Sequence, residues 1–198
     1  MFETTLALIV FLLALAYSPG PGNLFFAALG ARFGVRATIP ASAGYHLATW
    51  VVTVAIGLGF AAAVEAAPGM ATAIRWAGAT YVLRLAFGFL QAGTHEAEAT
   101  ARPAGFIDGA VLFLLNPKAY LIIALMFSQF LVEAAPDRLG AVLWIATVFT
   151  LNNLVAFVAW TVLGDRLAAG FRRPGAAQRL NRLFAGALAG VAIWMLAA

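Results

Sequence analysis

The chain of 198 residues contains no cysteine, and only 10% of its residues are charged. Without cysteine it cannot form a disulfide framework, a thiolate metal site or a cysteine nucleophile. Soluble domains are about a quarter charged, since polar side chains must cover their surface. Here hydrophobic residues make up 64% of the sequence, which argues against a soluble fold, a disordered chain and a nucleic-acid-binding protein. The composition predicts an integral membrane protein.

The sequence also lacks the motifs on which enzymes and ATP-driven pumps depend. It has no phosphate-binding loop, no HExxH pattern and no pair of acids at catalytic spacing. Ser18 with His46 is the one pair that offers a hydroxyl group and a base, and nothing else supports a nucleophilic site. We therefore expect no enzyme, no metal and no cofactor, so any pumping would have to use an ion gradient or exchange.

Six stretches are long and apolar enough to cross a bilayer, for which a helix needs about 20 mostly apolar residues. They cover approximately residues 4–30, 39–64, 71–91, 106–132, 139–163 and 183–197. Prolines interrupt the first and the fourth of these stretches. The apolar N-terminus is not expected to be a cleaved signal peptide, because residues 1–6 include Glu3 and no basic residue. The sequence thus predicts an all-α fold with six transmembrane helices.

Basic residues are distributed unevenly between the predicted loops on the two sides of the membrane. The side that holds the N-terminus has one, Arg138. The opposite side has eight, namely Arg32, Arg36, Arg102, Arg166, Arg172, Arg173, Arg179 and Arg182. Because basic loops remain in the cytoplasm, this second side is predicted to be cytoplasmic and both termini to lie outside. The stretch 166–182 is interpreted as a topology anchor, with a site for anionic lipid as the alternative.

The two halves of the chain share one pattern. Pro19 and Pro117 lie 98 residues apart, and half of the chain is 99 residues. Three spans precede the polar stretch 94–105 and three follow it, so a second repeat would insert upside down relative to the first. This predicts one transporter domain, 1–198, made of two inverted repeats, about 1–95 and 105–198. The alternative is a pair of unrelated proline kinks, which membrane helices tolerate.

The first break contains two prolines and two glycines, namely Pro19, Gly20, Pro21 and Gly22. Proline has no N–H group and clashes with the preceding turn, so a regular helix cannot continue here. Unwound backbone at membrane depth requires a protein interior or a polar cavity. We expect the helix to restart near Asn23, with Asn23 as its cap and free N–H groups that suit a carboxylate. The bare carbonyls of Ala16, Tyr17 and their neighbours should suit a cation or an ammonium group.

The second break repeats this chemistry. Asn116 stands where a cap is expected and Pro117 at the first helical position, which proline favours. Lys118 follows directly, and a lysine near the middle of a membrane is a candidate for function by default. The alternatives are that its long side chain extends to the membrane surface, or that it pairs with Asp108 or with a helix end.

Five further polar residues fall within predicted spans. Asn152 and Asn153 either line a cavity, which we favour, or hold two helices together. His46 titrates near neutrality and is a candidate for proton coupling, although a structural histidine is the more common case. Arg84 lies near the centre of the third span and is either coupled to transport or part of an ion pair, and Asp108 is the remaining coupling candidate.

The two proline motifs carry a family resemblance. Ser18-Pro19-Gly20-Pro21-Gly22-Asn23 resembles the Pro-Gly-Pro motif of the lysine-exporter (LysE/RhtB) family. Residues 115–119, Leu-Asn-Pro-Lys-Ala, are similar to that family's second signature, and Ser128-Gln129-Phe130 resembles the Pro-Gln-Phe that follows it. Residues 78–81 and 181–190 are also similar to the family, so the resemblance extends over the whole chain. Ser128, Arg84 and Ala86 depart from the family pattern.

This resemblance implies a bacterial inner-membrane exporter of amino acids or close derivatives, driven by the proton gradient, with a homodimer as one assembly. It also implies a central site at the two breaks, formed by Pro19, Gly20, Pro21, Asn116, Pro117 and Lys118. We expect alternating access, with Gly22, Asn23, Asn152 and Asn153 completing the site. The alternatives are a membrane scaffold that transports nothing, and a passive channel.

Overall fold

The computed structural model describes residues 2–60, 69–91, 102–131, 137–170 and 176–197. This part of the chain contains helices and no strand, as predicted. The elements are α1 (Phe2–Tyr17), α2 (Pro21–Phe33), η1 (Val35–Thr38), α3 (Ile39–Ala55), η2 (Ile56–Phe60), α5 (Met70–Gln91), α7 (Phe106–Leu114), α8 (Pro117–Phe130), α9 (Arg138–Gly170) and α10 (Ala176–Ala197). The predicted span ends at 64 and 132, most of the polar stretch 94–105, and Arg172 with Arg173 lie outside the described residues.

Both predicted breaks are present. The axes of α1 and α2 differ by 65°, and those of α7 and α8 by 63°. Each second helix begins with a proline at its first position, Pro21 in α2 and Pro117 in α8. Proline suits this position because the N–H group that it lacks would have no partner within the helix. The sequence therefore fixes both the end of one helix and the start of the next.

The cap of α2 differs from the expectation. Gly20 occupies the N-cap position, so α2 begins two residues before Asn23. The reason is Pro21, whose fixed φ angle already suits the first helical turn. Asn23 then lies inside this turn, and its side chain is free to bond elsewhere. At the second break Asn116 is the N-cap residue, as expected, although its side chain makes no capping hydrogen bond.

Helices occupy all six predicted stretches. Among the described helices, Val35–Gly59 and Arg138–Ala168 are each long and apolar enough to cross a membrane, and the two bent pairs raise the number to as many as four. The other two predicted spans correspond to α5 and to α10, whose apolar part is Arg182–Ile193. The count of six spans therefore stays a prediction.

Two helices extend beyond their predicted ends. α9 continues past residue 163 to Gly170, and α10 begins at Ala176 instead of 183. Arginine and alanine are good helix formers, so the helices continue through polar residues such as Arg166 and Arg182 that hydropathy assigns to loops. Hydropathy predicts which part of a helix lies within the membrane. The helix itself can continue beyond the membrane surface.

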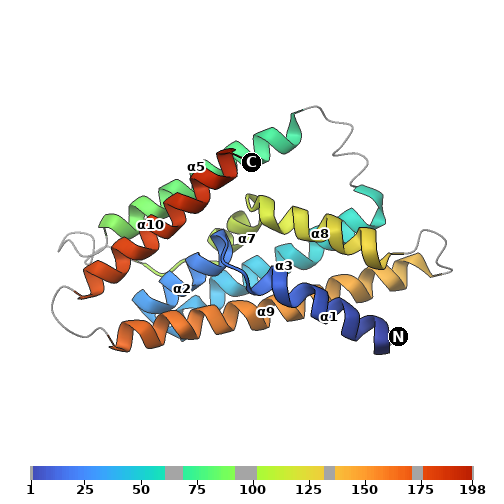
Figure 1. Ribbon diagram of the computed structural model, residues 1–198, viewed down its shortest axis with the longest axis horizontal. Coiled ribbons are helices and arrows are strands. Elements are labelled where there is room, and N and C mark those ends of the chain that lie inside the picture. The colour runs from blue at the N-terminus through green and yellow to red at the C-terminus, as the bar shows by residue number, and fades with distance from the viewer. Residues whose placement is uncertain (1, 61–68, 92–101, 132–136, 171–175, 198) are drawn as a thin grey trace.

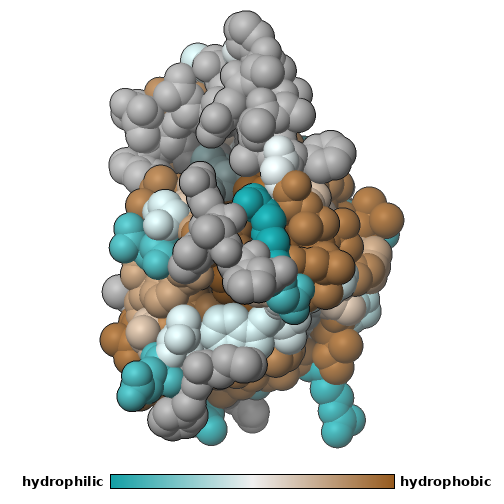
Figure 2. Space-filling view, turned by 90° about the vertical axis from the view of Figure 1, so that its right-hand side faces the viewer, coloured by the Kyte–Doolittle hydropathy of each residue, from teal (hydrophilic) through white to brown (hydrophobic). Residues whose placement is uncertain are grey.

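The helices pack in pairs, with α2 along α9, α3 along α7 and α5 along α10 (Figure 1). α5 and α10 lie side by side at one edge of the molecule, while α9 runs along the opposite edge (Figure 1). Large apolar side chains are exposed on the outer faces, including Leu6, Val10, Leu47, Val51, Leu151 and Val155. Figure 2 shows such apolar surface over much of one side of the molecule, as expected for contact with lipid.

Glycines bring two of these pairs into backbone contact. A Cβ atom on Gly109 of α7 would collide with the carbonyl of Ala41 in α3, and one on Gly44 of α3 would collide with the carbonyl of Phe106. Gly164 and Gly30 play the same role between α9 and α2. Small residues at crossing points allow close packing of membrane helices, and here they fix α2, α3, α7 and α9 against one another.

This packing predicts that Gly109→Ala destabilises the protein, although alanine is the better helix former. The new methyl group would meet backbone that cannot move aside, so we expect a loss of about 2 kcal/mol or more. Gly186→Ala in α10 is the matched control, since its Cβ would meet no described atom within 4 Å. Thermal unfolding in detergent measures both, and equal melting temperatures would contradict the assigned helix contact.

Candidate functional site

The two helix breaks lie against each other. The ammonium group of Lys118, from the second break, donates a hydrogen bond to the carbonyl of Ser18 at 2.7 Å and one to the Ser18 hydroxyl at 3.0 Å. The Pro19 carbonyl lies 3.5 Å from the same nitrogen. Residues 100 positions apart thus form one site. Of the alternatives for Lys118, the structure selects the pairing with a helix end and not the one with Asp108.

Gly20 makes this approach possible. A Cβ atom at Gly20 would lie 2.8 Å from Cδ and 3.1 Å from Nζ of Lys118. Gly22 is restricted in the same way, because its Cβ would lie 2.7 Å from the ring of Phe157 and 3.1 Å from the hydroxyl of Tyr45. Two glycines of the first break therefore leave room for side chains that belong to other parts of the chain.

The carbonyl groups expected to be bare already have partners within the protein. The Asn23 side-chain amide donates to the Ala16 carbonyl at 2.9 Å, and the Trp160 indole N–H donates to the Tyr17 carbonyl at 3.1 Å. The expectation for these two carbonyls was therefore wrong, because side chains satisfy them. The carbonyl that accepts an ammonium group is that of Ser18.

Asn116 connects the second break to a residue that the sequence analysis missed. Its amide donates to the hydroxyl of Tyr45 at 3.0 Å, while its Oδ1 atom is buried and has no partner among the described residues. Tyr45 is almost fully buried and packs against Phe157 and Phe113, with ring centroids 4.6 and 5.4 Å away. A tyrosine within an apolar span needs a hydrogen-bond partner for its hydroxyl group, and this was the available signal.

A small cavity lies between the breaks. Its polar lining residues are Asn23, Tyr45, Asn116, Lys118 and Asn153, and apolar side chains complete the wall. Its volume of about 10 Å³ is at the lower limit for one water molecule, so an amino acid cannot enter without movement of the helices. The structure is closed around this site.

Asn152 and Asn153 separate. Asn153 is buried and lines the central cavity, as we favoured. Asn152 is only half-buried and does not line it, although its Nδ2 atom has no partner among the described residues. Neighbouring positions on a helix point about 100° apart, so only one of two adjacent asparagines can face the centre.

His46 borders the central cluster without lining its cavity. The ring packs against Tyr45 and Phe157, with centroids 5.4 and 5.2 Å away. Nδ1 lies 2.7 Å from the carbonyl of Ser42, which assigns the ring proton to Nδ1. Nε2 is buried without a partner in the described part of the chain. The other side of the ring faces a pocket of about 320 Å³ between α3 and α9.

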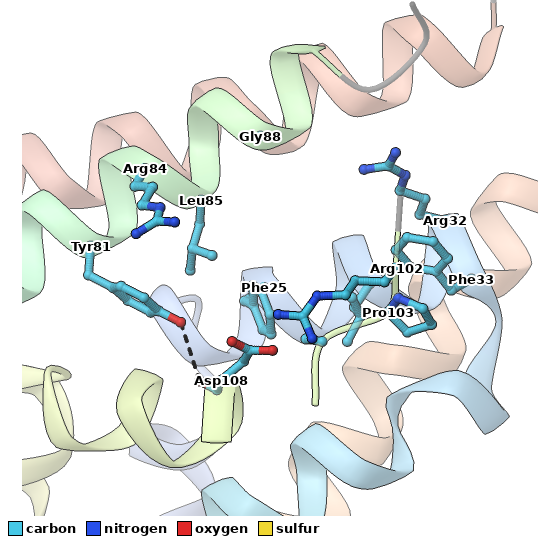
Figure 3. Close-up of a pocket in the computed structure, with 12 residues that line it drawn as sticks. Phe25, Arg32, Phe33, Tyr81, Arg84, Leu85, Gly88, Arg102, Pro103 and Asp108 are labelled. Carbon is cyan, nitrogen blue, oxygen red and sulfur yellow. Dashed lines mark hydrogen bonds between the residues drawn. The ribbon is translucent and has the colours of Figure 1, made fainter. Parts of the chain in front are cut away.

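Arg84 and Asp108 lie away from the breaks, in a separate pocket between α2, α5 and α7 (Figure 3). Asp108 stands in the first turn of α7, where its carboxylate accepts the N–H group of Gly105 at 2.8 Å. Tyr81 donates a long hydrogen bond, 3.4 Å, to the Asp108 carbonyl. The structure thus brings together the residues of the two breaks and Asn153. Arg84 and Asp108 lie outside this cluster, in the separate pocket.

The described helices have apolar outer faces and enclose a buried polar cluster at two broken helices. This is the general construction of secondary transporters, which place their sites at discontinuous membrane helices. Comparison with known proteins defines the family. Residues 13–198 match the pattern of LysE type translocators, and the chain belongs to this family, as the two proline motifs indicated.

Individual relatives agree with this assignment. The chain is 33% identical to an uncharacterised membrane protein of Pseudomonas aeruginosa, over 96% of this chain and 88% of the relative. It is 24% identical to a homoserine/homoserine lactone efflux protein of Salmonella typhimurium (92% and 91%) and 28% identical to a cysteine/O-acetylserine efflux protein of Salmonella choleraesuis (86% of each). No solved structure matches the chain. The protein is therefore a multi-pass membrane protein of a translocator family.

The hydrogen bond between Asn116 and Tyr45 generates a stability prediction. Tyr45→Phe leaves the buried Asn116 amide without its acceptor, which should cost about 1–3 kcal/mol. In an Asn116→Ala background the same substitution should cost clearly less, because there is no longer a donor to leave unpaired. The free energy of unfolding in detergent is measured for the original protein, the two single variants and the double variant, which together form a double-mutant cycle. Additive effects would show that the two side chains are not coupled.

Proposed function

We propose that this protein is a secondary-active exporter of small amino acids or their derivatives across the bacterial inner membrane. The observation that carries the proposal is the ammonium group of Lys118 at the Ser18 carbonyl and hydroxyl. A site that binds one ammonium group within the protein has the chemistry to bind another. Related proteins named as efflux systems for homoserine, cysteine and O-acetylserine support this substrate class.

In this proposal Lys118 occupies the place of the substrate's amino group while the site is closed. An arriving amino acid presents its own ammonium group to Ser18 and Pro19 and displaces the lysine. The displaced Lys118 then pairs with the substrate carboxylate. This exchange leaves no buried charge without a partner, which is the condition for low cost in an apolar interior.

The start of α2 provides further groups for the carboxylate. The first N–H groups of a helix have no partner within the helix and carry partial positive charge, and in α2 these belong to Gly22 and Asn23. Asn116, with its unpartnered Oδ1, and Asn153 complete the polar lining of the cavity. A zwitterion would thus find acceptors for its ammonium group at Ser18 and donors for its carboxylate at Lys118 and the start of α2.

A cavity of about 10 Å³ has to widen before it holds an amino acid, so transport requires movement. We propose alternating access between two inverted repeats, in which α1 with α2, α3 and α5 correspond to α7 with α8, α9 and α10. The pairing of α3 with α9 and of α5 with α10 supports this, because corresponding helices then meet each other.

One pairing does not follow the proposed symmetry. α2 packs closely along α9, whereas α8, the counterpart of α2, has little contact with α3, the counterpart of α9. Inverted repeats that exchange conformations would exchange these contacts as well. We therefore propose that the opposite state separates α2 from α9 and closes α8 onto α3. The arginine distribution supports an orientation in which the C-terminal end of α2, with Arg32, faces the cytoplasm and both termini lie outside it.

Efflux from proteoliposomes preloaded with labelled homoserine, cysteine and O-acetylserine tests the proposal. Lys118→Ala should reduce the rate by tenfold or more, because the substrate carboxylate loses its partner. Arg166→Ala, which removes an exposed positive charge, is the control and should leave the rate unchanged. Gel filtration in detergent checks that each variant is folded, and the amount of protein that floats with the vesicles checks its insertion. Equal rates for the two variants would overturn the role of Lys118.

The same vesicles separate the proposal from its alternatives. A carrier shows saturable efflux and faster uptake of label when unlabelled substrate fills the other side, whereas a channel shows neither. A scaffold shows no flux. N-acetylated amino acids lack the ammonium group and should not be exported, and their export at the normal rate would contradict the site assigned at Ser18.

We propose that a proton gradient drives export and that His46 is the first coupling candidate to test. It packs against the aromatic residues of the central cluster and its Nε2 atom is unpartnered among the described residues. Arg84 and Asp108 remain candidates by their charge alone. His46→Gln should still exchange substrate between the two sides of the membrane. The factor by which an imposed pH gradient accelerates efflux should fall at least tenfold in this variant. An unchanged response to the gradient would exclude His46.

A further inference from the structure

The pocket that holds Arg84 and Asp108 is separate from the central cavity between the two breaks. Its volume is about 240 Å³, and its walls come from one face of α2, one face of α5, the segment 102–104 and the first turn of α7 (Figure 3). Three arginines line it, Arg32, Arg84 and Arg102, against one acid, Asp108. Its formal charge is therefore +2, in a chain that has only 12 basic residues.

The three arginines reach the pocket from different elements. Figure 3 shows Arg84 extending from α5, Arg32 from α2 and Arg102 from the segment before α7, with the Arg102 guanidinium pointing toward Asp108. Arg32 lies 5.0 Å from the ring centroid of Phe33. Among the described residues, neither Arg84 nor Arg102 has a hydrogen bond or an ion pair within 4 Å. Like charges that converge repel one another, and among the described lining residues only Asp108 carries a negative charge.

Asp108 supplies only part of the compensating charge, and it also has a structural role. One carboxylate oxygen accepts the Gly105 N–H group, so the side chain caps α7. The remainder of the lining is mostly apolar, with Phe25, Leu29, Leu85 and the ring of Tyr81. Gly88 of α5 has no side chain, and a Cβ atom there would meet no described atom within 4 Å, so α5 leaves the pocket open at this point. The pocket thus combines an arginine cluster with apolar walls that suit an attached carbon chain.

We propose that this pocket binds an oxyanion, a phosphate or a carboxylate group carried on a small organic chain. Guanidinium groups match the planar, forked geometry of such oxygens better than ammonium groups do. Arg32 and Arg102 also belong to the arginines on the predicted cytoplasmic side, where basic pockets between membrane helices bind anionic lipid headgroups. The same chemistry would accept a free anion, so the two sources have to be separated by experiment.

The test uses the full-length protein, purified in a neutral detergent, and its melting temperature. One series adds phosphatidylglycerol, with phosphatidylcholine of the same acyl chains as the control. A second adds inorganic phosphate, with chloride at equal ionic strength as the control. Stabilisation by phosphatidylglycerol alone assigns the pocket to a lipid headgroup, and stabilisation by phosphate as well assigns it to oxyanions in general.

Variants locate the effect. Arg84→Gln and Arg102→Gln should each weaken binding by about tenfold, because each removes one charged hydrogen bond. Both side chains are exposed, so each variant should fold like the original protein. Either variant alone is sufficient to test the site. Arg166→Gln, an exposed arginine outside the pocket, should keep the full stabilisation. No stabilisation by either anion, or equal stabilisation of all variants, would overturn the proposal. Transport is not measured, so this result is independent of the proposed export.

Discussion

Unwound backbone inside an apolar protein has to find partners, and this requirement organises the centre of the molecule. Each break frees carbonyl and N–H groups that lipid cannot satisfy. The protein satisfies carbonyls of the first break with side chains: Asn23, seven residues further on, bonds the carbonyl of Ala16, and Trp160 of α9 bonds that of Tyr17. Lys118 bonds Ser18. The breaks therefore cannot lie apart, and the glycines at the first break leave the space that these contacts need.

In the proposed function, a substrate enters this closed site by exchange with Lys118. The lysine ammonium and the ammonium group of an amino acid are chemically equivalent at the Ser18 carbonyl. Moving one out as the other moves in therefore costs little. The same arrangement holds the two breaks together when no substrate is present. Under this proposal, the contact that stabilises the closed state is also the contact that binds the substrate.

Much of this could be predicted from the sequence, because its strongest signals are local. Hydropathy located the helices, and Asn116 with Pro117 predicted where the second broken helix restarts. The family followed from the same motifs. What could not be predicted depends on contacts between distant segments. No residue near Lys118 in the sequence indicates that Ser18 is its acceptor. Likewise, no motif near Tyr45 indicates that its hydroxyl group accepts a hydrogen bond from Asn116. Asn23 was assigned as a cap because local preference favours it, whereas Pro21 moves the cap to Gly20.

The most direct test is a structure of the protein with a bound amino acid, at a resolution that shows the Lys118 side chain. The account predicts that the ligand's ammonium group lies within hydrogen-bond distance of the Ser18 carbonyl. It also predicts that Lys118 has moved to the ligand's carboxylate. A structure in which Lys118 remains on Ser18 and the amino acid is bound elsewhere would contradict it.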